Sequence, residues 1–506
     1  MRKLKVLGVM GLTLFLGSTI RAQTAPGVNN AALQGGYAFT FTGMTTGNGV
    51  DSTPFAAVGR FTSDGAGNLT NGELDTNGIG LPEKLIAQAF TGTYSIGSDN
   101  RGVMSLNIPG GGTLAFAMTA NGNAKFVEID AAGGHGTVGS GTIEKVDTTA
   151  YSTARITGDY AFGVAGFDQS NNRTAIAGRF TANGAGTFTN GAADINLSGT
   201  FSTLNVFAGS YMVTDGATGR GILTMPPVVG GTPSNLNFVF YVVNAGKVFA
   251  MEADVVSPLT PLLNGMILQQ QTPVGGFSSA SLNGNTVIYL TGRTICPGRS
   301  DAAPNVVTGL LSTNGVGIAN LTDDQNCGGG SGSFDGWAGT YDVTSGGRAE
   351  FRLELVNPAV GGAYVAAYLV SSNQAFFIVP DGSVLFGFGE AQAAGSFTNS
   401  AVTGRYAGLA TTPAALGVSI FSGEFTANGA IPTGNITGTE DIGASGGPTV
   451  GASVNATYSV SSSLTNGRGT IAGNIAGNGV LYVISASKFV VASMTDSEPA
   501  ILIFEQ

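Results

Sequence analysis

Two pairs of acidic residues are the first candidates for chemistry in this chain of 506 residues. Glu128 and Asp130 stand in the segment FVEID, and Glu252 and Asp254 stand in the segment MEAD. Residues two apart on a β-strand share one face and lie about 7 Å apart, so the carboxylate pair of a glycoside hydrolase, or a metal contact, could begin in this way. Two further copies of the segment keep a single Asp, which favours the interpretation of all four residues as solvated carboxylates at the ends of strands.

The other chemically active residue types are too few for a recognised centre. The chain has one His and two Cys, whereas zinc needs three or four converging N, S or O ligands. The segment GASGG at 443–447 matches the letters of a nucleophile elbow, but that motif has meaning only between a strand and a helix, and no helix is expected there. We therefore predict no catalytic residue, no metal site and no cofactor.

A recurring arginine is the third candidate. Arg101, Arg220, Arg348 and Arg468 each begin a predicted strand and are 119, 128 and 120 residues apart. We identify no other charged position that every copy keeps. An Arg at a hairpin can pack on an aromatic ring and hydrogen-bond terminal carbonyl groups. We expect these four residues to be structural and to pack on the Tyr of the first strand.

All of these residues belong to a repeated unit. The segment GRFTSDGAGNLTNGELD returns 119 residues later as GRFTANGAGTFTNGAAD, and repetition of this kind indicates tandem modules. The opening glycines of four copies, Gly35, Gly158, Gly284 and Gly404, are 123, 126 and 120 residues apart. We predict four modules of about 120 residues, over 32–148, 154–272, 278–394 and 400–506.

Each module is predicted to be all-β. In the segment FTGTYSI apolar and polar residues alternate, which indicates a half-buried strand. Eight short antiparallel strands in sequence order suit a closed up-and-down β-barrel; a β-sandwich is the alternative. The strands predicted for the first module are 34–43, 54–63, 67–76, 88–97, 101–108, 113–120, 123–130 and 139–146.

The repeated Asp64-Gly65 is interpreted as a turn. The other three copies have Asn-Gly at this place, and both dipeptides close β-hairpins because they tolerate positive φ. A calcium loop would need the carboxylate in every copy.

The two cysteines occur only in the third module. Cys296 lies in the connection after the first predicted strand, and Cys327 lies in the connection after the third. In an up-and-down order these connections are at the same end of the barrel. Because an exported protein meets an oxidising compartment, we predict a disulfide between them.

The N-terminal residues have the pattern of a secretory signal peptide. Basic residues are followed by an apolar run and then by small and polar residues, so we assign 1–22 to a signal peptide and 23–31 to a linker. No later segment has 18 uninterrupted apolar residues, so no transmembrane helix is expected. Four of the 21 basic residues lie in the leader, which leaves 17 against 31 acidic residues and argues against a nucleic-acid partner.

The opening strands resemble those of the calycin group, which comprises the lipocalins and avidins. In that group a Gly-x-Trp on strand one is covered by an Arg at the closed end of an eight-stranded barrel. Here three copies have Gly-x-Tyr at the corresponding place, namely Gly35-x-Tyr37, Gly158-x-Tyr160 and Gly404-x-Tyr406. The repeats as a whole also resemble uncharacterised secreted β-repeat proteins of environmental bacteria.

These observations favour a non-enzymatic protein that is secreted, periplasmic or on the cell surface and acts as an interaction or structural module. Variable connections on a repeated scaffold suit multivalent binding, and the partner could be a protein, a glycan or a small apolar ligand. The first alternative is a carrier of small apolar ligands inside the barrels, lined by aromatic residues such as Phe116, Phe238 and Phe240. The second is an outer-membrane β-barrel.

Overall fold

The computed structural model shows four closed barrels, each of eight antiparallel strands in sequence order. This confirms the predicted up-and-down barrels and excludes the sandwich. The predicted signal peptide, 1–22, and the first part of the predicted linker, 23–31, lie outside the described residues. The structure describes residues 27–46, 53–80, 84–130, 136–226, 235–296, 300–355, 362–411, 420–461, 466–475 and 477–506.

The first half of the chain forms barrels 1 and 2. Barrel 1 consists of β1 (Gln34–Thr46), β2 (Thr53–Asp64), β3 (Asn68–Gly78), β4 (Gln88–Ile96), β5 (Arg101–Asn107), β6 (Thr113–Met118), β7 (Ala124–Glu128) and β8 (Gly136–Lys145). Barrel 2 consists of β9 (Thr157–Phe167), β10 (Arg173–Asn183), β11 (Thr187–Leu197), β12 (Thr200–Val213), β13 (Arg220–Met225), β14 (Leu236–Asn244), β15 (Lys247–Glu252) and β16 (Leu262–Gln269).

The second half forms barrels 3 and 4. Barrel 3 consists of β17 (Asn283–Ile295), β18 (Ala302–Asn314), β19 (Ile318–Cys327), β20 (Gly330–Val343), β21 (Arg348–Leu355), β22 (Ala363–Ser371), β23 (Gln374–Ile378) and β24 (Phe386–Ala391). Barrel 4 consists of β25 (Thr403–Ala410), β26 (Ile420–Asn428), β27 (Gly434–Gly443), β28 (Thr449–Val460), β29 (Arg468–Gly473), β30 (Gly477–Ser485), β31 (Lys488–Ser493) and β32 (Ile501–Glu505).

One end of each barrel is closed by a short 3-10 turn that precedes its first strand: η1 (Asn30–Ala32), η3 (Thr153–Arg155), η4 (Ser279–Ser281) and η5 (Asn399–Ala401). A Tyr on the fourth strand holds the turn. In barrel 1 the Tyr94 hydroxyl donates to the Leu33 carbonyl at 2.9 Å and to the Asn30 carbonyl at 3.0 Å. Asn30 belongs to the predicted linker, so this part of the linker packs on barrel 1.

The helices of the described residues are all three-residue turns, and none of them could span a membrane.

The repeated hairpin lies at the same closed end. In barrel 1 the Asp64 carboxylate accepts hydrogen bonds from the backbone of Ala66 and Asn68, and Gly65 has a φ of +75°. In barrel 2 the Gly184 amide donates to the hydroxyl of Tyr211, the strand-four Tyr of that barrel, at 2.8 Å. The turn interpretation is therefore correct, and the motif helps to close the barrel.

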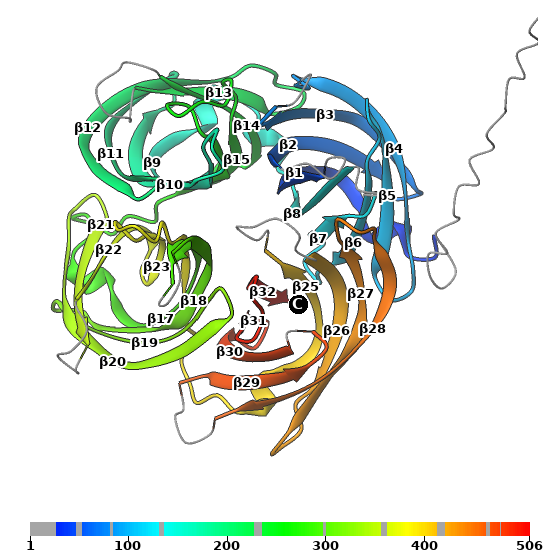
Figure 1. Ribbon diagram of the computed structural model, residues 1–506. Helices are drawn as coiled ribbons and strands as arrows, with labels where there is room; N and C mark the ends of the chain where they lie inside the picture. The colour runs from blue at the N-terminus through cyan, green and yellow to red at the C-terminus, as the bar shows by residue number, and fades with distance from the viewer. Residues whose placement is uncertain are drawn as a thin grey trace, which may run out of the picture.

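The four barrels are arranged in a ring (Figure 1). Strands β14 and β15 of barrel 2 pack against β1 and β2 of barrel 1, and the same strands meet between barrels 3 and 2 and between barrels 4 and 3. Strands β6 and β7 of barrel 1 then pack against β25 and β26 of barrel 4. One head-to-tail contact is thus used four times and closes on itself, as in a cyclic oligomer.

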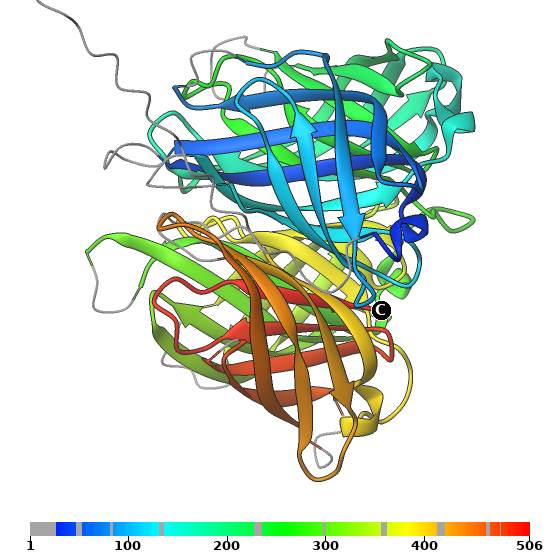
Figure 2. The same cartoon turned by 90° about the vertical axis from the view of Figure 1, so that its right-hand side faces the viewer.

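The ring places equivalent ends of the barrels on the same face of the molecule. Figure 1 views the barrels nearly end-on, and Figure 2 shows the blue turn η1 and the gold turn η5 on the same side of the molecule. The connections after strands one, three, five and seven therefore lie toward the opposite face. We call this second face the open face.

The junctions between barrels 1 and 2, 2 and 3, and 3 and 4 each have their own apolar core, and in the first two of these Ala-rich strands face larger residues of the next barrel. This is why β2 is buried on both faces and lacks the alternation seen in β4. At the junction of barrels 2 and 3, a Cβ on Gly163 would lie 2.3 Å from a ring carbon of Phe376, so only Gly fits there. The core between barrels 1 and 2 includes Ala38, Ala56, Val58, Val239, Tyr241, Phe249 and Met251.

Candidate functional site

The four repeat arginines lie at the junctions, and each pairs with an Asp of the preceding barrel. Between barrels 2 and 1, Arg220 donates from Nε and Nη2 to the two carboxylate oxygens of Asp75, at 2.8 and 2.7 Å. Such bidentate pairs are strong and geometrically specific. The other three pairs are Arg348 with Asp194, Arg468 with Asp324 and Arg101 with Asp441.

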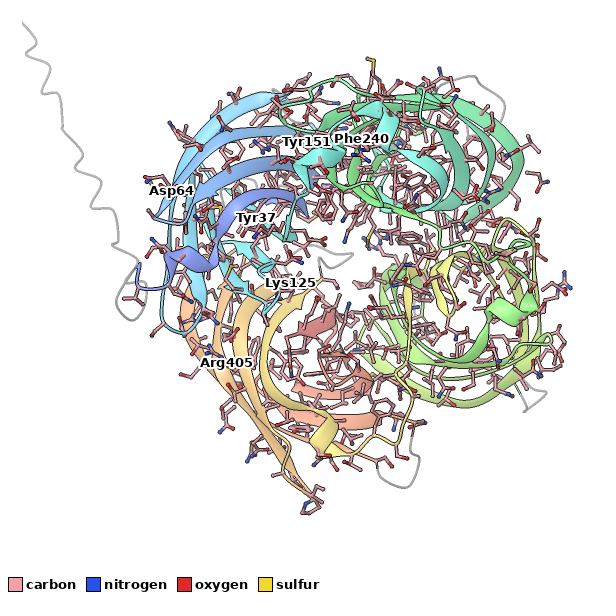
Figure 3. All side chains as sticks on the ribbon, turned by 180° about the vertical axis from the view of Figure 1, so that it is seen from behind. Tyr37, Asp64, Lys125, Tyr151, Phe240 and Arg405 are labelled. Atoms are coloured by element: carbon pink, nitrogen blue, oxygen red, sulfur yellow. A yellow bond between two sulfur atoms is a disulfide. The ribbon has the colours of Figure 1, made fainter. Side chains whose placement is uncertain are left out.

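The expectation that these arginines pack on the strand-one Tyr is wrong. Tyr37 is buried in the core of barrel 1 and is stacked on Phe61, with ring centroids 5.6 Å apart. Figure 3 labels its place on this barrel. The Arg101 side chain leaves its own barrel and reaches barrel 4. The repeat shows that an Arg recurs in every module. It does not show whether the residue that pairs with this Arg belongs to the same module or to a neighbouring one.

Our sequence interpretation also missed the acidic half of the pairs. Asp75, Asp194, Asp324 and Asp441 occupy one position in all four copies, 119, 130 and 117 residues apart. The recurrence was therefore visible in the sequence, and the Arg is not the only charged position that every copy keeps.

A Tyr and an Asn make further hydrogen bonds at three junctions, those between barrels 1 and 2, 2 and 3, and 3 and 4. The hydroxyl of Tyr241 donates to Asp75 at 2.8 Å, and Tyr368 and Tyr482 make the equivalent bond in the next two junctions. The side-chain amide of Asn77 donates to the carbonyl groups of Glu252 and Asp254, at 2.7 and 2.9 Å. Asn196 and Asn326 do the same further on.

The ring-closing junction between barrels 1 and 4 departs from this pattern. Ala117 pairs with Arg101 across the sheet where the other barrels have Tyr, and two residues after Asp441 the chain has Gly443 where the others have Asn. The pair is nevertheless the most buried of the four, with Arg101 3% exposed and Asp441 1% exposed. Arg101 also pairs with Asp99 of its own barrel, at 2.9 Å.

A second set of ion pairs joins the barrels nearer the ring centre. Lys247 of barrel 2 pairs with Glu144 of barrel 1 at 2.7 Å, and Lys125 of barrel 1 pairs with Glu505 of barrel 4 at 3.0 Å. Figure 3 shows Lys125 at the boundary of these two barrels. Lys488 of barrel 4 pairs with Glu390 of barrel 3 at 2.7 Å. Burial lowers the pKa of Lys488, but the neighbouring carboxylates raise it by more.

Glu252 is not solvated, which corrects that interpretation for one of the four carboxylates, whereas Glu128, Asp130 and Asp254 are partly buried. Glu252 is fully buried, and burial raises its pKa to about 9. Burial, with a further contribution from Asp130, raises the pKa of Glu128 well above its ordinary value. The end of strand seven is covered in barrel 2 by Asn77 of barrel 1. Within the described ranges, no group of three or more His, Cys, Asp and Glu residues is arranged to hold a metal ion.

The predicted disulfide is present. Cys296 and Cys327 are bonded, with their Cα atoms 5.7 Å apart. The bond joins the chain just after β17 to the last residue of β19, so both cysteines lie at the open end of barrel 3.

The barrel interiors differ between the two halves of the ring. The inward residue just before the junction Asp is Leu74 in barrel 1 and Ala193 in barrel 2, where it is part of an apolar core. The aromatic residues that we named as possible cavity linings, Phe116, Phe238 and Phe240, are buried in these cores. The inward residue becomes Asp323 in barrel 3 and Glu440 in barrel 4, and each of these side chains lines a cavity.

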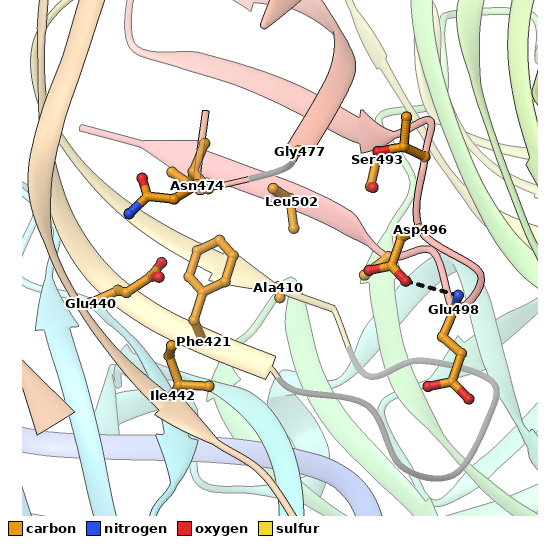
Figure 4. Close-up of a pocket in the computed structure, with 13 residues that line it drawn as sticks. Ala410, Phe421, Glu440, Ile442, Asn474, Gly477, Ser493, Asp496, Glu498 and Leu502 are labelled. Carbon is orange, nitrogen blue, oxygen red and sulfur yellow. Dashed lines mark hydrogen bonds between the residues drawn. The ribbon is translucent and has the colours of Figure 1, made fainter. Parts of the chain in front are cut away.

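The cavity of barrel 3 has a volume of about 260 Å³ and is mainly apolar. Trp337 lines it and donates from Nε1 to the Asp323 carboxylate at 2.8 Å. Asn305 is only 1% exposed, and its Nδ2 has no hydrogen-bond partner among the residues that the structure describes. The cavity of barrel 4, shown in Figure 4, has a volume of about 300 Å³.

Comparison with known proteins gives little guidance. No protein-family model matches the chain, and a search of curated proteins finds no match. Among solved structures, the chain shows a likeness to a double mutant of the vaccine antigen transferrin binding protein B from Haemophilus parasuis. The identity is 11%, the TM-score is 0.20, and the likeness covers 94% of this chain and 95% of that chain. At this TM-score the arrangements differ too much for the likeness to carry an argument.

Proposed function

We propose that this protein is a non-enzymatic interaction protein of the cell exterior, in which four barrels form one rigid ring that presents related binding surfaces to a partner. The observation that carries the proposal is the closed ring of barrels joined by four Arg–Asp pairs. A string of independent barrels would need no such pairs.

The junctions are suited to fixing geometry. Buried ion pairs contribute little net stability compared with apolar packing, but breaking one is costly, so they favour one arrangement over its alternatives. Arg220, Arg348 and Arg468 each reach the Asp of the preceding barrel through a planar contact from Nε and Nη2. Arg101 reaches both oxygens of Asp441 through Nη1. The four barrels are thereby held in one register around the ring.

The open face is the surface that we assign to the partner. The barrels bring corresponding connections to this face, while their sequences differ, for example SG at 198–199 after the third strand of barrel 2 and ASGGP at 444–448 after the third strand of barrel 4. Loops on a rigid scaffold are common binding sites. Several weak contacts made at once can raise affinity by about 100-fold or more without any strong single contact.

The test measures binding of the full mature protein to arrays of extracellular polysaccharides and secreted proteins. One variant replaces DQSNN at 168–172, on the open face, with GNGVDS, the sequence of residues 47–52. A matched control replaces the closed-end turn GAG at 65–67 with GAIPT from the corresponding place in barrel 4, 429–433. We expect the first exchange to change binding and the second to leave it unchanged. Binding to neither array, equal effects of both exchanges, or cleavage of an arrayed polysaccharide would contradict the proposal.

A second function, carriage of a small apolar ligand, is favoured by the cavity of barrel 3. The Nδ2 group of Asn305, which has no partner among the described residues, could donate to a carbonyl or ether oxygen of such a ligand, while Trp337 and the apolar wall contact the rest. Because Trp337 is the single Trp of the chain, its fluorescence reports occupancy directly. Titration with medium-chain alkan-2-ones should change this fluorescence saturably, and the Asn305→Leu variant should bind more weakly. A flat titration would exclude carriage in this barrel.

A further inference from the structure

The cavity of barrel 4 is acidic on two sides and apolar at its base. Glu440 projects into it from β27, and Asp496 and Glu498 face it from the connection between β31 and β32 (Figure 4). Phe421 and Leu502 contribute apolar surface between these groups. Among the described residues that line the cavity, none is Lys or Arg.

Glu440 is buried without a matching partner. Its side chain is 5% exposed, and Oε2 accepts no hydrogen bond within the described residues. Burial, with a smaller contribution from Asp441, raises the pKa of Glu440 to about 7. A buried carboxylate that lacks a donor is costly. The neighbouring Arg101 does not relieve the cost, because both carboxylate oxygens of Asp441 receive its Nη1.

The corresponding positions of the other barrels show that this arrangement is specific to barrel 4. Barrels 1 and 2 have apolar residues in place of Glu440, and in barrel 3 the corresponding Asp323 accepts a hydrogen bond from Trp337. Four residues before the strand-four Tyr, where barrel 3 has Trp337, barrel 4 has Val454. The Val454 side chain has no hydrogen-bond donor, so barrel 4 has no counterpart of the Trp337–Asp323 hydrogen bond at this position.

We propose that this cavity binds a small organic cation, namely a protonated amine on an apolar body, with its ammonium group donating to Oε2 of Glu440. The apolar body would lie against Leu502 and the ring of Phe421, whose face also attracts a cation. A bare metal ion fits less well, because Ca²⁺ requires six to eight oxygen ligands and the described residues hold no such group. This inference is independent of the proposed function of the open face.

The experiment is isothermal titration calorimetry of the full mature protein with hexylamine. 1-Hexanol has the same apolar body without charge, hexyltrimethylammonium keeps the charge without an N–H donor, and CaCl₂ tests a metal ion. We expect saturable binding of hexylamine, about tenfold or more weaker binding of the other two organic probes, and no binding of Ca²⁺. Equal binding of hexylamine and hexanol, no binding of hexylamine, or preferential binding of Ca²⁺ would overturn the proposal.

Two variants locate the site. Glu440→Gln keeps the shape of the side chain but removes its charge, and it should weaken hexylamine binding by about tenfold or more. Glu424→Gln is the matched control, because Glu424 is a similarly buried Glu of barrel 4 that pairs with Arg405 and does not line the cavity. It should leave binding within about twofold. Equal effects of the two substitutions contradict the assignment; the probe series on the unmodified protein tests it even if a variant does not fold.

Discussion

Removing Asp194 should destabilise the junction of barrels 2 and 3 more than any surface substitution. Asp194 is fully buried and accepts from Arg348 Nε at 2.6 Å, Arg348 Nη2 at 2.9 Å, Tyr368 at 2.9 Å and Thr203 at 2.6 Å. Removal of one partner of a buried pair costs about 3 to 5 kcal/mol. Because Arg348 retains Glu350 as a second partner, we expect Asp194→Ala to cost about 3 kcal/mol, the lower end of that range.

The double substitution Asp194→Ala with Arg348→Met sharpens the prediction. It removes both charges, so no unpaired guanidinium stays at the junction, and most of the lost stability should return. The matched control is Arg352→Ala on the same strand, β21. Arg352 is 64% exposed and pairs with Glu350 at the surface, so its loss should cost less than about 1 kcal/mol.

Urea unfolding followed by the fluorescence of Trp337 measures these costs for barrel 3 in particular, because the chain has one Trp and it lies in that barrel. The reasoning is refuted if Asp194→Ala costs no more than Arg352→Ala. It is also refuted if the double substitution costs as much stability as Asp194→Ala and Arg348→Met, measured separately, cost together.

Three further predictions follow from other sites. The pKa of Glu440 rises from 4.5 to about 7 in the folded protein. Between these two pH values the folded state therefore keeps a proton that the unfolded state has lost, so the free energy of unfolding should fall by on the order of 3 kcal/mol as the pH rises from 4.5 to 7. Glu440→Gln should remove this part of the pH dependence in urea unfolding. Replacing Cys296 and Cys327 by Ser opens a loop of 31 residues and should cost about 3 to 4 kcal/mol on chain-entropy grounds; an unchanged urea midpoint would show that the bond does not stabilise barrel 3. Gly163→Ala places a Cβ 2.3 Å from Phe376 and should cost about 1 to 3 kcal/mol, whereas no shift in melting temperature would mean that this junction is loosely packed.

The strands could be predicted because their alternation depends on local sequence. In β4, Phe90, Tyr94 and Ile96 are buried inside the barrel while the residues between them are more exposed, and the order of residue types along the segment already indicates this alternation. The disulfide could be predicted for a related reason, since strand order alone placed Cys296 and Cys327 at one end of one barrel.

The ring could not be predicted in the same way. An Arg and an Asp that recur in every copy have the same sequence pattern whether each pair forms within a barrel or between barrels. The burial of Glu252 was missed for the same reason, because the residue that covers the end of its strand is Asn77 of another module. A repeat sequence is sufficient to predict the fold of one module. Contacts between modules can be assigned only when their three-dimensional arrangement is known.

A zero-length carbodiimide cross-link tests most directly whether the ring is closed, that is, whether barrel 1 contacts barrel 4 in the way that barrel 2 contacts barrel 1. The reagent joins the amine and the carboxylate of an ion pair. Lys125 and Glu505 lie 3.0 Å apart across the ring-closing junction, and Lys247 and Glu144 lie 2.7 Å apart, with similar exposure, across the junction of barrels 1 and 2. Mass spectrometry of the cross-linked monomer should find both linked peptides. Recovery of the Lys247–Glu144 link without the Lys125–Glu505 link would mean that the ring is open.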